Sequence, residues 1–207
     1  MPIKLSNRSE AELFAKTSWQ HFEDVYKLQE AMGRKMGLSK IPTYVVNGTT
    51  DMYMEIEGVI EPQDCIVDFG DGVKRPAKTF ETYVIESDYY LTHLLKEMEG
   101  TGRFRLVRER VRRGFDLLQK KESHIFNCTG IEGPSIAGDS KPMNELKGHI
   151  MKFRLSDYPQ VKDFVLALKL ESGHFILQIP QPQRDYFALG ITYEAGKRNP
   201  NPFVEEK

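Results

Sequence analysis

The chain changes from helical to β-strand periodicity at the stretch Pro42-Thr43-Tyr44-Val45-Val46-Asn47-Gly48. Its middle four residues are β-branched or aromatic, which favours a strand, and Asn47-Gly48 is typical of a tight hairpin turn. Residues 52–57 then alternate between apolar and mostly polar side chains, which is the pattern of a half-buried strand. Further strand-like runs follow, so we predict an antiparallel meander over residues 43–86.

A long helix is predicted before this point, from about Ser9 to Lys35. Ser9 and Glu12 have the spacing of a capping box, and Gly33 and Gly37 lie where a helix would end. Between them, apolar side chains recur at helical spacing, namely Leu13, Phe14, Trp19, Phe22, Val25, Tyr26, Leu28 and Met32.

Helical periodicity returns over residues 89–99 and again over 103–121. Strand-like runs dominate the last sixty residues, where Glu171-Ser172-Gly173 separates two runs as a hairpin turn would. We therefore predict an α+β fold, in which the long N-terminal helix and a central helical pair pack on antiparallel β-sheet. The sheet consists of the meander 43–86 and the C-terminal strands within 148–193.

The length of 207 residues suits one large domain or two small ones. We predict a single domain over residues 1–207, and the pattern leaves open a division into two lobes, 1–100 and 101–207. Residues 1–100 carry 11 Lys and Arg against 17 Asp and Glu, a net charge of −6, whereas residues 101–207 carry 18 against 13, a net charge of +5. Such halves can neutralise each other on folding, or leave a dipolar surface that favours self-association or an acidic partner.

Composition is that of an ordinary globular protein, with 40% apolar and 29% charged residues. No window approaches the length of a membrane span, and the first residues contain no apolar run of signal-peptide length. We therefore expect a cytoplasmic protein that does not associate with membranes. The two cysteines, Cys65 and Cys128, lack metal-ligand spacing and are predicted to be buried thiols.

The segment 102–121 contains eight basic residues and two acidic ones. Its apolar residues recur at steps of three and four, which predicts an amphipathic helix over 103–121 with basic side chains on its other faces. Lysine and arginine on such a helix can neutralise phosphates, and arginine adds bidentate contacts. The predicted binding residues are Arg103, Arg105, Arg108, Arg110, Arg112, Arg113, Lys120 and Lys121.

The segment predicts a non-enzymatic binding protein whose basic helix grips an acidic partner, with nucleic acid as the favoured partner. One alternative is an assembly or regulatory protein, whose acidic and basic halves meet between subunits of a homo-oligomer or on a partner protein. In the other main alternative, the basic face is solvated or paired with the chain's own acidic half.

No motif points strongly to catalysis, a metal or a cofactor, and we predict none of these. The five histidines, His21, His93, His124, His149 and His174, lack metal-ligand spacing. Asp68 and Asp71 could ligate a cation, but their Gly-rich turn is far more typical of ordinary turn residues. A second alternative function, an RNA-processing enzyme, would use the Gly- and Pro-rich stretch 129–147 as a lid and one of the last three histidines as an acid or base.

The arginine-rich run Arg103–Arg113, followed by Ser172-Gly173-His174-Phe175-Ile176-Leu177 and Phe187-Ala188-Leu189-Gly190, resembles the back half of CRISPR RNA endonucleases. The resemblance covers less than half of the chain, and the opening helix departs from that family's first strand. It implies RNA as a partner to test and carries no catalytic residue across to this chain.

Overall fold

The computed structural model describes residues 8–48, 55–110, 124–139, 146–172, 175–190 and 194–195. The described α-helices are α1 (Arg8–Met32), α2 (Ser87–Gly100) and α4 (Gly133–Ala137). The described strands are β1 (Leu38–Val46), β2 (Gln63–Val67), β3 (Arg75–Ile85), β4 (Leu146–Lys147), β5 (Met151–Arg154), β6 (Val165–Lys169), β7 (Phe175–Gln181), β8 (Tyr186–Gly190) and β9 (Glu194–Ala195). Short 3-10 helices are η2 (Gly130–Glu132), η3 (Leu155–Asp157), η4 (Pro159–Val161) and η5 (Pro182–Arg184).

The chain forms two compact units. The first, which we call the sheet unit, lies within residues 1–101 and 150–191 and contains α1, α2 and seven strands. The second unit lies within residues 102–149 and 192–207 and contains η2, α4 and the antiparallel pair β4–β9. Both ends of the second unit's longer segment connect to the sheet unit, so this segment is an insertion between α2 and β5.

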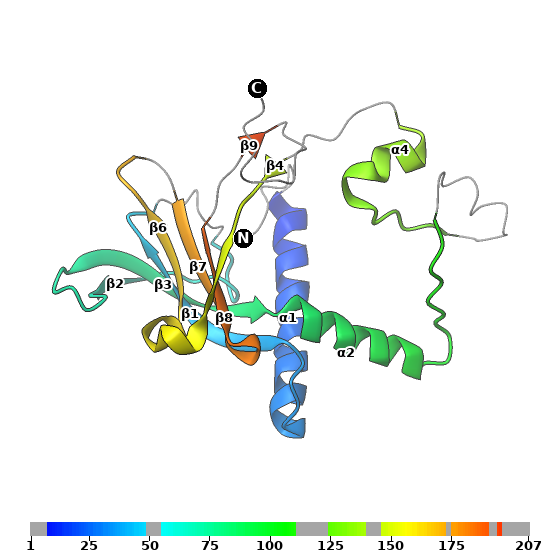
Figure 1. Ribbon diagram of the computed structural model, residues 1–207, viewed down its shortest axis with the longest axis horizontal. Coiled ribbons are helices and arrows are strands. Elements are labelled where there is room, and N and C mark those ends of the chain that lie inside the picture. The colour runs from blue at the N-terminus through cyan, green and yellow to red at the C-terminus, as the bar shows by residue number, and fades with distance from the viewer. Residues whose placement is uncertain are drawn as a thin grey trace. The chain divides into compact units, whose positions relative to one another are not determined.

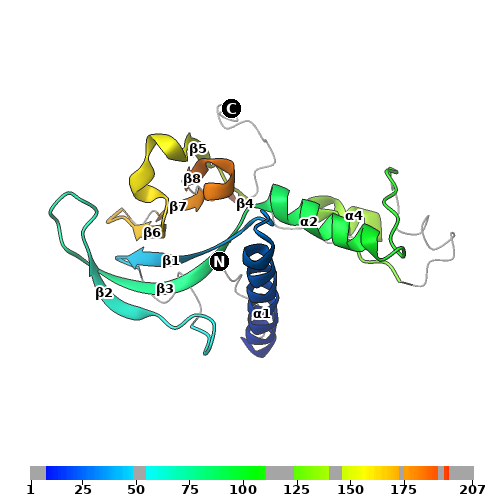
Figure 2. The same ribbon diagram turned by 90° about the horizontal axis from the view of Figure 1, so that it is seen from below.

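The sheet unit is built on one seven-stranded sheet with the order β2-β3-β1-β6-β7-β8-β5 (Figure 1). Strands from both halves of the chain therefore belong to a single continuous sheet. The α+β class and the long N-terminal helix are confirmed. Strand β3 is bent along its length (Figure 2), as expected of a long strand in a twisted sheet.

The prediction of a purely antiparallel sheet is wrong at its centre, because β1 and β6 are parallel. All the other neighbouring pairs of this sheet are antiparallel. A parallel pair needs a long crossover connection, and here about 120 residues separate the two strands. The strands that pair with β1 are β3 and β6. Residues 49–54 of the hairpin expected after Asn47-Gly48 lie outside the described residues, and Ile56 makes an isolated bridge to Ile60.

Helix α1 packs against the sheet through an aromatic cluster. The ring of Trp19 lies 4.8 Å from the ring of Tyr83 on β3, and the rings of Phe22 and Tyr26 also contact Tyr83. These residues recur at the helical spacing seen in the sequence, which places them on the face of α1 that meets the sheet. Behind them, Val25 is buried against the start of β1.

The end of α1 is tied to the sheet unit by a buried polar network around Gln29 and Gln183. The Gln29 side chain accepts hydrogen bonds from the backbone N–H of Met36 (2.9 Å) and from the Gln183 side chain (3.1 Å), and it donates to the Leu38 carbonyl (2.8 Å). The backbone N–H of Gln183 donates to the Glu86 carboxylate (2.9 Å). The network joins the α1–β1 connection, the start of α2 and the β7–β8 connection.

The prediction of the second helix of the central pair is wrong over residues 103–110, which are the described part of it. Helix α2 confirms the prediction over 89–99, but residues 103–110 are not helical. Gly102 adopts φ +66° after α2, and the side chains of Leu106 and Val107 are 58% and 53% exposed. Most helices in proteins depend on packing of an apolar face, and these side chains have no such packing. Residues 111–121 of the predicted helix lie outside the described residues.

Two smaller findings bear on the sequence predictions. Cys65 is half-buried and Cys128 is exposed, so the prediction of two buried thiols is wrong for Cys128, and both thiols are free. Among the described residues, no helix combines the length and the apolar character needed to span a membrane.

Candidate binding site for an acidic partner

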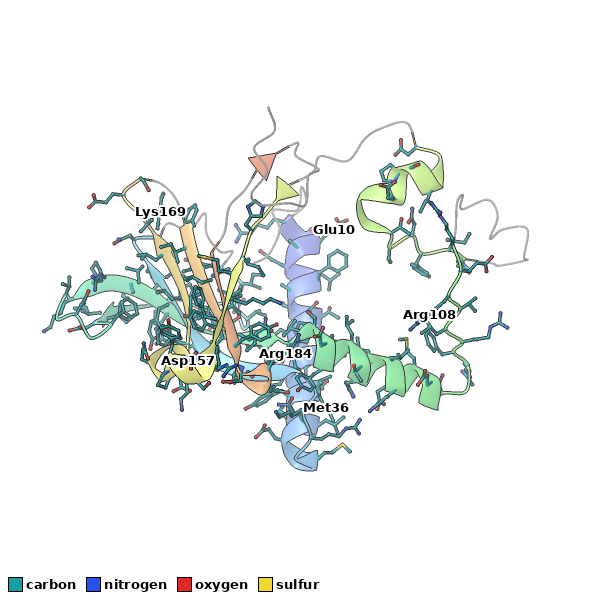
Figure 3. The ribbon with its side chains drawn as sticks, in the orientation of Figure 1. Glu10, Met36, Arg108, Asp157, Lys169 and Arg184 are labelled. Carbon is teal, nitrogen blue, oxygen red and sulfur yellow. The ribbon has the colours of Figure 1, made fainter. Side chains whose placement is uncertain are left out.

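Four of the eight predicted binding residues are described, and all four side chains are exposed. Arg103, Arg105, Arg108 and Arg110 lie on the irregular stretch that follows α2, which we call the arginine segment (residues 103–110; Figure 3 labels Arg108). The other four, Arg112, Arg113, Lys120 and Lys121, lie outside the described residues. Glu109 is the only acidic residue of the arginine segment, so the segment has a net charge of +3.

Local structure explains why these arginines are presented on an irregular backbone. Thr101 closes α2 by donating hydrogen bonds from its N–H (3.2 Å) and hydroxyl (2.7 Å) to the Met98 carbonyl. Gly102 then takes a left-handed conformation that favours glycine and directs the chain out of the helix. Arg105 and Arg108 are three residues apart and would be neighbours on a helix, so their like charges further oppose a helix that no apolar face stabilises.

Apolar side chains are interspersed with the arginines. Leu106 and Val107 are more than half exposed, whereas Phe104 is half-buried. Later in the same unit, Ile125 is 39% exposed and Phe126 is 90% exposed. An exposed ring and exposed guanidinium groups within one unit are a combination that proteins use to stack bases while they contact phosphates.

The stretch that carries Phe126 is held by a side-chain turn. Asn127 donates to the Gly133 carbonyl (2.8 Å) and accepts from the Thr129 hydroxyl (2.7 Å). The helices η2 and α4 follow this turn. Residues 130–137 of the predicted loop 129–147 are therefore helical. Phe126 is therefore exposed next to a hydrogen-bonded turn.

The second unit as a whole is basic. Its residues 102–149 and 192–207 carry 13 Lys and Arg against 9 Asp and Glu, a net charge of +4. The sheet unit carries 16 against 21, a net charge of −5. Of the net charge of +5 on residues 101–207, +4 thus belongs to the second unit, and residues 150–191 of the sheet unit contribute the remaining +1.

The other candidate residues of the sequence do not come together as a site. His21 hydrogen-bonds to the Tyr90 hydroxyl (2.6 Å) and His93 is buried on α2, which are both packing roles. His124 is exposed and His149 is half-buried, while His174 lies outside the described residues. Over the described parts of the chain, no three His, Cys, Asp or Glu side chains gather as metal ligands would.

Asp68 and Asp71 both serve the β2–β3 turn. The Asp68 carboxylate accepts hydrogen bonds from the N–H groups of Gly70 (2.9 Å) and Gly72 (3.1 Å). Asp71 pairs with Arg75 at 2.6 Å, and this hydrogen bond holds the pKa of the Asp71 carboxyl well below its usual range. Each carboxylate is thus engaged by its own turn rather than directed to a shared ligand.

Sequence reasoning missed Glu86, whose side chain is completely buried in front of α2. Burial raises the pKa of its carboxyl, and the hydrogen bond from the Gln183 N–H and the nearby charges of Lys35 and Arg184 offset part of that rise. Its second oxygen has no hydrogen-bond partner among the described residues. The one sequence signal for Glu86 is its position between the strand that ends at Ile85 and the helix that begins at Ser87.

Comparison with known proteins adds no relative: neither a family model nor a curated protein matches this chain. The interpretation of the arginine segment therefore depends on its own residues.

Proposed function

We propose that this protein is a non-enzymatic binding protein that holds single-stranded nucleic acid through the arginine segment. The observation that carries the proposal is the exposure of Arg105, Arg108 and Arg110 on one short irregular stretch. Guanidinium groups form short, charge-assisted and often bidentate hydrogen bonds with phosphate oxygens. An irregular backbone suits a flexible single strand, since both chains can adjust to bring charges into contact.

The exposed aromatic side chain of Phe126 supports a single-stranded rather than a duplex partner. The ring of Phe126 is 90% exposed, and bases that are not paired can stack on such a ring. The binding that results is tolerant of sequence, because phosphate contacts and stacking read no base edges. The net charge of +4 on the second unit adds long-range attraction for the same partner.

Salt dependence tests the proposal directly. If four arginines each neutralise a phosphate of a single strand, the slope of log affinity against log salt is about −3, and binding weakens ~50-fold between 50 and 200 mM salt. We expect this from fluorescence anisotropy with labelled 20-nucleotide single-stranded RNA and DNA. The RNA is then run on a denaturing gel, where an intact strand supports binding and cleavage would favour the RNA-processing alternative.

The matched variants separate this site from general charge. The triple variant Arg105→Glu, Arg108→Glu, Arg110→Glu should weaken binding at low salt by about 100-fold or more, since each lost charge-assisted bond contributes a sizeable share. The control Lys16→Glu, Lys96→Glu, Lys162→Glu changes the net charge equally at exposed positions of the sheet unit and should cost far less. Equal losses in the two variants, or no binding by the wild type, would refute the proposal.

A second candidate function, protein assembly, is favoured by the exposed apolar side chains of Leu106, Val107 and Phe126. Such side chains are enriched where proteins bind one another. Light scattering over a concentration series decides this candidate: a molar mass that rises with concentration, and falls back in Phe126→Ser, supports assembly. A constant monomer mass excludes self-association.

A further inference from the structure

One face of the sheet contains a cavity of about 340 Å³, distant in sequence from the arginine segment. Strands β1, β3, β6 and β7 provide its walls, and Ile60 from the β1–β2 connection adds one side chain. This volume lies at the lower end of the range for small-molecule sites, ~300–1,000 Å³. The cavity belongs entirely to the sheet unit.

Strand register explains why the cavity has one consistent lining. Thr43 and Val45 on β1 pair with Val165 and Ala167 on β6, so all four side chains lie on the same face. Phe80 on β3 pairs with Thr43 and extends this face to the next strand. The Thr43, Val45, Val165 and Ala167 side chains are each less than a tenth exposed, so the apolar lining is built into the core.

Among the described residues, no charged side chain lines the cavity, and the polar side chains that line it are few. They include the hydroxyls of Thr43 and Thr82 and the amide of Gln181. None of these three side chains hydrogen-bonds to any residue that the structure describes. A bound molecule could therefore use them without displacing an internal partner.

We propose that this cavity binds an uncharged small molecule with a compact apolar body and one hydrogen-bonding end, such as a hydroxyl. The apolar walls stabilise the body, and the Thr and Gln side chains pair with the end group. A carboxylate or ammonium end is disfavoured, because it would lose hydration beside apolar walls and no described lining residue supplies an opposite charge. The site is independent of the proposed nucleic-acid binding.

The experiment uses the neutral probe N-phenyl-1-naphthylamine, whose fluorescence increases in apolar surroundings, and displaces it with 1-octanol or octanoate at pH 8. The full-length protein should enhance the probe's fluorescence, and 1-octanol should displace the probe at a concentration at least ten-fold lower than octanoate. No enhancement, or equal potency of alcohol and carboxylate, overturns the proposal.

Three variants locate the binding. Ala167→Leu fills the cavity from its floor and should abolish most of the fluorescence, whereas Phe126→Ser, which removes an exposed ring elsewhere, should leave the fluorescence unchanged. Thr82→Val keeps the shape and the fold and removes one hydroxyl, so it should weaken the displacement by 1-octanol about three- to ten-fold without affecting the probe. Unchanged probe binding in Ala167→Leu, or loss of the signal in Phe126→Ser, places the probe on another surface and refutes the site.

Discussion

The two units of this protein differ in whether their polar side chains are buried or exposed. In the sheet unit, Gln29 is 8% exposed, and it and Gln183 bond to backbone groups that would otherwise be buried without partners. In the second unit, the described arginines point to solvent, and apolar side chains beside them are exposed as well. Buried polar contacts therefore concentrate in the sheet unit, while the described arginines of the second unit are exposed.

The largest expected change in the free energy of unfolding comes from a substitution at Gly37, where the sheet unit has no room for a side chain. A Cβ at this position would lie 2.6 Å from both the Glu86 carbonyl oxygen and the Tyr90 nitrogen, and the backbone has φ +83°. We expect Gly37→Ala to lower the free energy of unfolding by about 4 kcal/mol, from clash and left-handed strain together. Urea unfolding followed by the fluorescence of Trp19, the only tryptophan, measures it.

Gly33→Ala is the matched control for that substitution. Gly33 also has a positive φ, +58°, but no atom lies within 4 Å of the added Cβ. Its cost should be only the conformational strain of about 1–2 kcal/mol. Equal destabilisation by the two substitutions would show that the close contact at Gly37 does not matter.

Gln29→Leu should have the next largest effect, because it removes an acceptor from the centre of the polar network. The N–H groups of Met36 and Leu38 would lose the oxygen to which they now donate at 2.9 and 3.3 Å. Leaving buried donors unpaired costs about 3 kcal/mol in total. The exposed Gln20, which donates to Asp24 one turn along α1, is the control: Gln20→Leu should change the free energy of unfolding by less than ~0.5 kcal/mol.

The sequence predicted the elements of the sheet unit better than their arrangement. The aromatic periodicity around Trp19 and Phe22 is local, so it identified α1 and part of the face that packs on the sheet. Other residues of the predicted face are exposed, namely Leu13, Phe14, Leu28 and Met32. The parallel pairing of β1 with β6 and the bond between Gln29 and Gln183, 154 residues apart, are set by tertiary packing. No local pattern distinguishes such a buried glutamine from one on a solvated helix face.

In the second unit, the sequence predicted the location of the basic charge but not the local structure. Phe104 and Val107 have helical spacing, but the spacing indicates only that a helix could bury them, not that a surface is there to receive them. The exposure of Leu106 and Val107 supplies the missing information. The sequence did identify where basic charge gathers, because charge is a property of composition and does not depend on packing.

A pH-dependent prediction sharpens the contrast at Glu86. Burial raises the pKa of this carboxyl in the folded state, so the folded protein holds the proton more tightly than the unfolded chain. The resulting stability is present at acid pH and is lost as pH rises through the folded pKa. Glu86→Gln does not titrate, so it should be more stable than the wild type at pH 8, and the difference should shrink toward pH 4.

Comparing the two proteins at each pH isolates this group, since all other carboxyls, including Asp71 with its lowered pKa, are common to both. Unfolding in urea at pH 4, 6 and 8 provides the measurement. A difference that is constant with pH, or that grows toward acid pH, would contradict the raised pKa.

The smallest expected effect on stability is at the arginine segment, and it is the sharpest test of the division between the units. Exposed surface substitutions change the free energy of unfolding by about 0.5 kcal/mol or less, so Arg105→Glu, Arg108→Glu, Arg110→Glu should leave urea unfolding of the sheet unit nearly unchanged. One charge reversal in the sheet unit should lower the free energy of unfolding more than these three substitutions together. Lys40 is 25% exposed at its side chain, bonds to Glu23 at 3.2 Å and lies over the Trp19 ring, so Lys40→Glu should cost about 2–3 kcal/mol. If the triple variant loses as much free energy of unfolding as Lys40→Glu, the arginines stabilise the fold, and their exposure does not indicate that they are available to a partner.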